Sequence, residues 1–154
     1  MGEMRQKTFS KESMHEFMPP ISLRLGAVLF DYMLILFPPV IALAAGRLLG
    51  LDGTRLLNSE IVSIAWFLTL LIFFANQVLF PVLTGQTFGK RLLGLRIVDL
   101  EGRLPMLRAV LQRNLLGYLI NVITFGIAFL PFLGGVGRGL HDRISGTVVI
   151  RADI

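Results

Sequence analysis

The 154-residue sequence contains no cysteine and few charged side chains. The absence of cysteine excludes a disulfide framework, thiol catalysis and a metal site built on cysteine. Charged residues make up only 16% of the chain, whereas 54% of the residues are hydrophobic. This balance is too apolar for an ordinary soluble domain and indicates a membrane protein. Three buried helices of a soluble protein are a weak alternative in so short a chain.

Charge is missing altogether from three stretches, residues 32–46, 61–83 and 114–137. The first stretch extends back past Asp31 to Leu25, which gives three apolar segments of roughly 20 residues or more. Each segment can cross about 30 Å of hydrocarbon as an α-helix that rises ~1.5 Å per residue. The sequence therefore predicts an all-α fold, a polytopic bundle of transmembrane helices with three apolar segments.

The first two segments have recognisable boundaries. The first predicts a helix over residues 23–49, and the double proline at 38–39 is expected to kink it. Proline removes a backbone donor and clashes with the preceding turn. The second segment predicts a helix over residues 60–83, for which Asn58 or Ser59 is a suitable N-cap.

The chain divides into a polar N-terminal tail, residues 1–22, and one transmembrane domain, residues 23–151. The tripeptide "ALA" at 42–44 resembles a signal-peptide cleavage site. The charged leader before the first apolar run is 24 residues long, however, and Asp31 lies within that run. Both features are unusual for a cleaved signal peptide, so we expect the first segment to be retained.

The stretch at residues 85–113 is of a different kind, with six Lys or Arg residues and two acids. Alternation over residues 95–100, followed by a Glu-Gly turn signal, predicts a short strand. The terminal "TVVIR", residues 147–151, is also strand-like and can pair with the first strand only on the same side of the membrane. "MLRAVLQRNLL", residues 106–116, has helical periodicity and is expected to lie along the membrane interface.

The distribution of the 15 Lys and Arg residues predicts the topology. They number four in residues 1–24, two in 46–60, six in 85–113 and three in 138–151. Because the most basic loops face the cytoplasm, the N-terminus and the 85–113 loop are expected inside. A straight third helix would leave the three arginines of the tail outside. We therefore favour a third segment that is broken near "TFG" and returns as a hairpin, with the small β element in the cytoplasm.

One carboxylate, Asp31, interrupts the first apolar segment. An unpaired charge there costs at least ~2.5–3.5 kcal/mol, so it must be paired, hydrated or protonated. Arg24 lies seven residues earlier on the same helix face, ~10 Å away along the axis. Simple rise arithmetic places Asn76 or Gln77, and Asn121, at the same depth as Asp31, roughly 9–12 Å into the bilayer. We expect these side chains to form one polar layer.

Two interpretations of this polar layer are open. In the first interpretation, the layer is an ion or proton site, at which Asp31 exchanges a proton for a monovalent cation. Alternatively, it is a buried polar clamp that fixes the packing of the helices. Three or four helices enclose little volume, so a transport path predicts a homo-oligomer. "GRLLG" at 46–50 fits a small-residue helix contact.

Catalytic and nucleotide-binding patterns are absent. "GQTFGKR" at 85–91 has three residues between its glycines instead of the four of a phosphate-binding loop, and Arg91 replaces the required Ser or Thr. His141 and Asp142 are adjacent, and no serine or second carboxylate is placed to complete an acid–base site. Metal-ligand spacing is not found. The sequence thus indicates neither an enzyme nor a bound cofactor.

Several motifs together resemble the RDD family of bacterial membrane proteins, over residues 18–151. They are an arginine entering the first helix, an aspartate seven residues later, "GQTFGKRLLGLRIVD", "LQRNLL" and "LHDRISGTVVI". The arginine and two aspartates for which the family is named correspond to Arg24, Asp31 and Asp142. The resemblance implies a protein of the cytoplasmic membrane, with cation/proton exchange proposed for some members. It also suggests that Asp142 meets Arg24 or Arg91.

Two functional hypotheses follow. The first is a small transporter that exchanges cations for protons at Asp31. The second is a non-transporting scaffold or accessory protein whose basic loop binds anionic lipid or a partner protein. The net charge of +5 is read as an orientation signal and as attraction to anionic lipid, not as a sign of nucleic-acid binding. The basic side chains of this loop are Lys90, Arg91, Arg96, Arg108 and Arg113.

Overall fold

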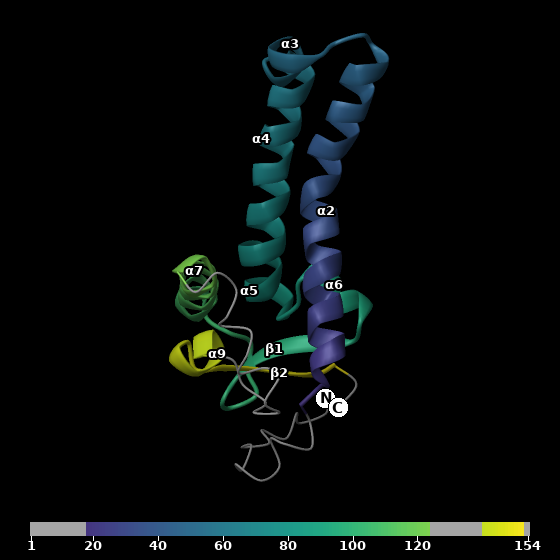
Figure 1. The fold of residues 1–154 in the computed structure, drawn as a ribbon. Coiled ribbons are helices and arrows are strands. Elements are labelled where there is room, and N and C mark those ends of the chain that lie inside the picture. Colours follow the sequence, from purple (N-terminus) through teal and green to yellow (C-terminus); the bar gives the residue numbers. More distant parts are fainter. Residues whose placement is uncertain (1–17, 124–139, 153–154) are drawn as a thin grey trace.

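The computed structural model describes residues 18–123 and 140–152 of the chain. Most of them are helical, and two short strands form a small sheet (Figure 1). In chain order the elements are α2 (Ile21–Leu48), α3 (Gly53–Leu57), α4 (Glu60–Phe74), the π-helix η1 (Ala75–Leu79), α5 (Phe80–Thr84), α6 (Phe88–Leu92), β1 (Leu95–Asp99), α7 (Leu107–Ile123), α9 (Leu140–Ile144) and β2 (Thr147–Arg151).

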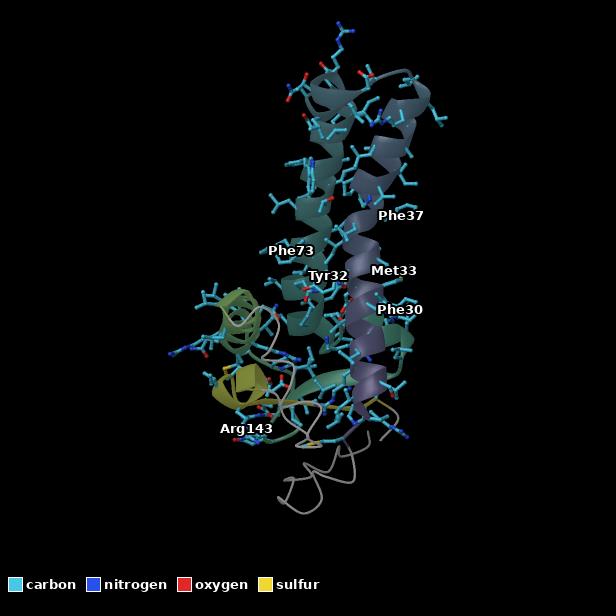
Figure 2. All side chains as sticks on the ribbon, in the orientation of Figure 1. Phe30, Tyr32, Met33, Phe37, Phe73 and Arg143 are labelled. Carbon is cyan, nitrogen blue, oxygen red and sulfur yellow. The ribbon has the colours of Figure 1, made fainter. Side chains whose placement is uncertain are left out.

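Two helical stretches among the described residues are long and apolar enough to cross a membrane. They are the 28-residue α2 and the 25 residues of Glu60–Thr84, formed by α4, η1 and α5. They lie side by side in Figure 1. Large apolar side chains such as Met33 and Phe37 are exposed, and Figure 2 shows both pointing away from α4. A core helix of a soluble protein would bury such side chains, whereas lipid can solvate them.

The predicted boundaries of both helices are confirmed to within two residues. α2 continues through Pro38 and Pro39 as one helix, and its axis changes direction in its middle (Figure 1). Ser59 caps the second stretch, since its Oγ accepts a hydrogen bond from the N–H of Val62 at 3.4 Å. The far end of the pair is closed by α3, where Leu56 packs against Ala42 and Val62.

The two predicted strands are confirmed, and they pair with each other. β1 and β2 are antiparallel, in a register that runs from Leu95 opposite Arg151 to Asp99 opposite Thr147. Residues 95–99 and 147–151 therefore lie at the same end of the helix pair, which we call the sheet end. One face of the sheet packs on α2 through a cluster of Ala27, Leu95, Ile97 and Val149.

The third apolar segment behaves differently from the first two. Figure 1 shows α7 end-on beside α5, whereas α2 and α4 are seen along their lengths. α7 thus runs across the helix pair. It contains most of the predicted interfacial helix and also residues 114–123, the start of the predicted third span. The described part of that segment is not a third parallel helix. Residues 124–139, which include the predicted hairpin break, lie outside the described residues.

Candidate functional site

Asp31 lies at the sheet end of α2 and is only 2% exposed. Its Oδ2 accepts a hydrogen bond from the hydroxyl of Thr87 at 2.6 Å. Its Oδ1 accepts one from the N–H of Gly89 at 2.7 Å and one from the amide of Asn76 at 2.9 Å. The ammonium group of Lys90 lies 4.0 Å from Oδ2. Both carboxylate oxygens are therefore occupied by protein donors.

The same contacts cap the N-terminus of α6. The first N–H groups of a helix have no partner within it and must find one elsewhere. Here the N–H of Phe88 donates to Oδ1 of Asn76 at 2.7 Å, the next N–H donates to Asp31, and that of Lys90 donates to Oγ1 of Thr87 at 3.3 Å. Three side chains, from α2, from η1 and from the residue that precedes α6, satisfy three successive donors, and the negative charge of Asp31 lies at the positive end of the helix.

Glycine is required where α6 meets α2. A Cβ atom at Gly89 would lie 1.9 Å from the carbonyl oxygen of Ala27. No side chain fits at that distance, so only glycine lets the two backbones approach closely enough for its N–H to reach Asp31. The second glycine of "GQTFGKR", Gly89, thus allows α6 and α2 to cross in close contact.

The π-helix η1 places Asn76 against Asp31 and α6. Asn76 is almost fully buried, and its amide bridges the carboxylate and the N–H of Phe88. Five residues after Asn76, Pro81 has no N–H to donate to the carbonyl four residues before it, that of Gln77. That carbonyl accepts a hydrogen bond from the amide of Asn114 on α7 instead. The irregular turn thereby holds both α6 and α7.

A second buried charge cluster lies beside the first. Asp142, on α9, is 1% exposed and forms an ion pair with Arg113 of α7, with Nε and Oδ1 separated by 3.2 Å. Arg24 of α2 donates from a guanidinium nitrogen to the carbonyl of Val149 on β2 at 3.4 Å. Arg24 also lies in the fields of Asp142 and Arg113. The cluster joins α2, α7, α9 and the sheet.

Lys90 connects the two clusters. Its ammonium group contacts Oγ1 of Thr87 at 3.3 Å and lies within the fields of Asp31, Asp142, Arg24 and Arg113. Burial lowers the pKa of Lys90 to about 8, and the nearby positive charge of Arg113 adds to this effect, while the carboxylates oppose it. Lys90 of α6 thus supplies a positive charge beside Asp31.

The predicted polar layer is brought together in part. Of the two alternatives Asn76 and Gln77, the side chain of Asn76 reaches Asp31, whereas Gln77 contacts Asn114 through its backbone carbonyl. Asn121 lies on α7, but its side chain is outside the described residues. Thr87 and Gly89 were missed by the sequence analysis, although Thr87 has the residue type and position of an N-cap. Its partner on α2, 56 residues away, has no local signal.

The predicted basic loop divides into two groups. Lys90 and Arg113 turn inward to the carboxylates, whereas Arg91, Arg96 and Arg108 are exposed. The Nε of Arg96 donates to the carbonyl of Thr84 at 3.2 Å.

The family resemblance suggested that Asp142 meets Arg24 or Arg91. Asp142 forms an ion pair with Arg113, which was not named for this role, and its charge also acts on Arg24. Within residues 18–123 and 140–152, no group of three or more Asp, Glu or His side chains is arranged to hold a metal ion. The hydrogen bonds and ion pairs around Asp31 and Asp142 join α2, η1, α6, α7, α9 and β2.

Comparison with known proteins gives one family. The sequence profile of the RDD family matches residues 18–146. The uncharacterized protein YckC of Bacillus subtilis is 30% identical over 135 residues, which cover 84% of this chain and 82% of YckC. The uncharacterized protein YxaI of the same organism is 32% identical over 94 residues, covering 58% of this chain and 62% of YxaI. No solved structure matches the chain.

Proposed function

Because the chain belongs to the RDD family, we propose that it is a multi-pass protein of the bacterial cytoplasmic membrane that acts as a scaffold or accessory protein. In this proposal Asp31 is a structural latch and not a transport group. The observation that carries it is that Asp31 is only 2% exposed and that both of its oxygens accept hydrogen bonds from the protein, from Asn76, Thr87 and Gly89, with Lys90 alongside. An exchange site needs an oxygen that a cation or water can reach.

The latch gives the sheet end a fixed shape. It holds α6 against α2, and α6 leads directly into β1, so the sheet is positioned by the same contacts. The exposed cations Arg91, Arg96 and Arg108 project from this platform. Such a surface is suited to anionic lipid head groups or to an acidic partner protein.

The pairing of the strands supports the proposed orientation. The two segments that meet in the sheet come from the stretches with six and three basic residues, which together hold nine of the 15 Lys and Arg side chains. Basic segments are retained in the cytoplasm. The N-terminus and the sheet end are therefore assigned to the cytoplasmic side, and the loop with α3 to the outer side.

Cation/proton exchange is a second candidate, and the position of Lys90 favours it. A buried lysine 4.0 Å from Asp31, with a pKa of about 8, can release its proton near neutral pH. A monovalent cation that took the place of the ammonium charge would leave the total charge unchanged. The two spans among the described residues enclose little volume, so this function would require a homo-oligomer.

Proton flux distinguishes the two candidates. The full-length protein and the Asp31→Asn variant are reconstituted into liposomes with a pH-sensitive dye inside, and Na⁺, K⁺ or Li⁺ is added outside. The scaffold proposal expects no cation-dependent flux from either protein. Cation-dependent flux in the natural protein that is lost in a folded Asp31→Asn variant would overturn it and establish exchange.

A further inference from the structure

The outward face of α7 carries a stripe of leucines. Leu107, Leu111, Leu115 and Leu119 follow one another at intervals of four residues, so they lie along one side of the helix. Their exposed fractions range from 45% to 71%. An exposed row of this kind is unusual on a surface that faces water and marks a contact with an apolar medium or a partner.

The opposite face of α7 is fixed to the protein. Val110 is buried, Arg113 pairs with Asp142, and the amide of Asn114 donates to the carbonyl of Gln77. These contacts set the rotation of the helix about its axis. The leucine stripe therefore points away from the protein because of the polar anchors, and α7 cannot turn to bury it.

The leucine stripe continues the apolar surface of the second membrane span. Next to α7, the end of that span exposes Leu79, Phe80 and Leu83. Figure 1 shows α7 running across the helix pair at this level. A single lipid phase can thus cover both surfaces without a break.

Charge on α7 indicates which lipids cover it. Its sequence contains two arginines and no acid. Arg113 is used internally, and Arg108 is exposed beside the leucines. A helix with leucines on one side and a flanking arginine has the composition of helices that lie in the plane of a bilayer surface. The arginine can reach lipid phosphate while its stem stays among the acyl chains.

We propose that α7 lies in the cytoplasmic membrane–water interface, with its leucine stripe among the acyl chains of one leaflet and Arg108 at the phosphates of anionic lipid. This inference rests on the placement of the two spans in the bilayer under the proposed function. It is independent of whether the protein transports ions, so a positive flux assay leaves it standing.

Depth measurements test the placement of the helix. Because the chain has no cysteine, single cysteines at the four leucine positions can each carry an environment-sensitive fluorophore. The full-length protein is placed in vesicles whose lipids bear nitroxide quenchers at defined depths. We expect strong quenching at one shallow depth for all four positions. Thr54→Cys, on exposed α3 at the other end of the pair, is the control and should remain unquenched.

Each alternative gives a different pattern. Quenching depths that increase from Leu107 to Leu119, about 18 Å along the helix, would show that α7 crosses the bilayer and would overturn the proposal. Unquenched fluorophores, together with fast reaction of the unlabelled single-cysteine proteins with a water-soluble thiol reagent, would show a helix in solvent. Unquenched fluorophores, together with disulfide-linked dimers of the unlabelled proteins after mild oxidation, would show a second copy on the stripe. Both results would also overturn it.

The lipid charge is tested with Arg108→Gln. Thermal unfolding is measured in phosphatidylcholine vesicles with and without one quarter phosphatidylglycerol. We expect the anionic lipid to raise the Tm of the natural protein and the Arg108→Gln variant to lose at least half of that rise. Arg47→Gln, an exposed arginine near the opposite end of α2, is the matched control and should keep it. An unchanged rise in Arg108→Gln would overturn the assignment of Arg108.

Discussion

The two ends of the helix pair are closed in opposite ways. At the end with α3, apolar side chains close the gap, with Leu56 against Ala42, Val62 and Ala65. At the sheet end, the gap is closed by buried charges and hydrogen bonds around Asp31. Apolar packing is non-directional and tolerates changes that conserve volume, whereas a buried polar network depends on every donor and acceptor being present.

This difference indicates where the fold is specified. A helix pair in lipid gains little from hydrophobic burial, because lipid tails are as apolar as leucine. The small apolar cluster at the α3 end can therefore hold two helices together but cannot select among many arrangements. The polar network at the sheet end selects one, since α2, η1, α6 and α7 must all be in register for the donors to be satisfied.

The largest effect is expected from Gly89→Ala. The added Cβ would lie 1.9 Å from the backbone oxygen of Ala27, and backbone cannot move aside as a side chain can. α6 would be displaced and the contacts to Asp31 lost, at a cost of more than about 4 kcal/mol in unfolding free energy. The measurement is chemical unfolding in detergent, followed by circular dichroism.

Gly26→Ala is the matched control for Gly89→Ala. Gly26 lies on α2 in the same crossing, but its added Cβ would meet only the flexible end of Leu93 at 3.1 Å. A change below about 1 kcal/mol is expected there. Equal losses from the two substitutions would show that α6 does not approach α2 as closely as described.

The next largest loss of unfolding free energy is expected from Asp142→Ala. Removal of the carboxylate leaves Arg113 buried without its ion-pair partner, and loss of one partner of a buried pair costs about 3 kcal/mol or more. Arg143→Ala removes an exposed neighbouring charge, at the edge of α9 in Figure 2, and should stay within ~0.5 kcal/mol. Thermal unfolding of both variants in the same detergent checks the difference. A small effect of Asp142→Ala would mean that the ion pair is hydrated.

Two conservative substitutions compare the ends directly. Asp31→Asn preserves size but removes the negative charge beside Lys90 and one acceptor, and we expect a loss of about 2 kcal/mol. Leu56→Met preserves volume at the α3 end and should cost less than ~1.5 kcal/mol. Unfolding free energies of the two variants give the comparison. If Leu56→Met proved the more harmful, the contrast between tolerant and intolerant ends would be wrong.

Sequence patterns were sufficient for the features that depend on neighbouring residues. Lack of charge located the two spans, Ser59 marked a helix start, and alternation located both strands. Asp31 was found because a carboxylate in an apolar run is costly and demands a partner. Because the rise of a helix is regular, positions on two helices could be compared, and this gave Asn76 or Gln77 as a partner on the second span; Asn76 is the one that bonds to Asp31.

The remaining features depend on contacts distant in the chain. Thr87 and Gly89 reach Asp31 across 56 and 58 residues, and no local pattern encodes that distance. Arg113 turns inward and Arg108 is exposed. The rotation of α7 about its axis decides this difference, and the sequence alone does not give that rotation. A helix along the interface was predicted for residues 106–116, but its crosswise continuation over residues 117–123 was not, because an uncharged run predicts an apolar environment and not the direction of the helix axis.

The remaining prediction concerns pH and sharpens the charged side of the comparison. The pKa of Lys90 falls from 10.5 to about 8 in the folded protein, chiefly through burial. Between these values the unfolded chain binds more protons than the folded one, so the free energy of unfolding should rise as pH increases from about 8 to 10.5. Below pH 8 Lys90 is charged in the folded protein, and its contribution to the free energy of unfolding is at its lowest. Lys90→Met keeps the aliphatic stem and removes the titration, so its unfolding free energy should lack this rise. Parallel slopes for the two proteins over this range would show that water reaches the ammonium group, and that the sheet end is less dry than its hydrogen bonds imply.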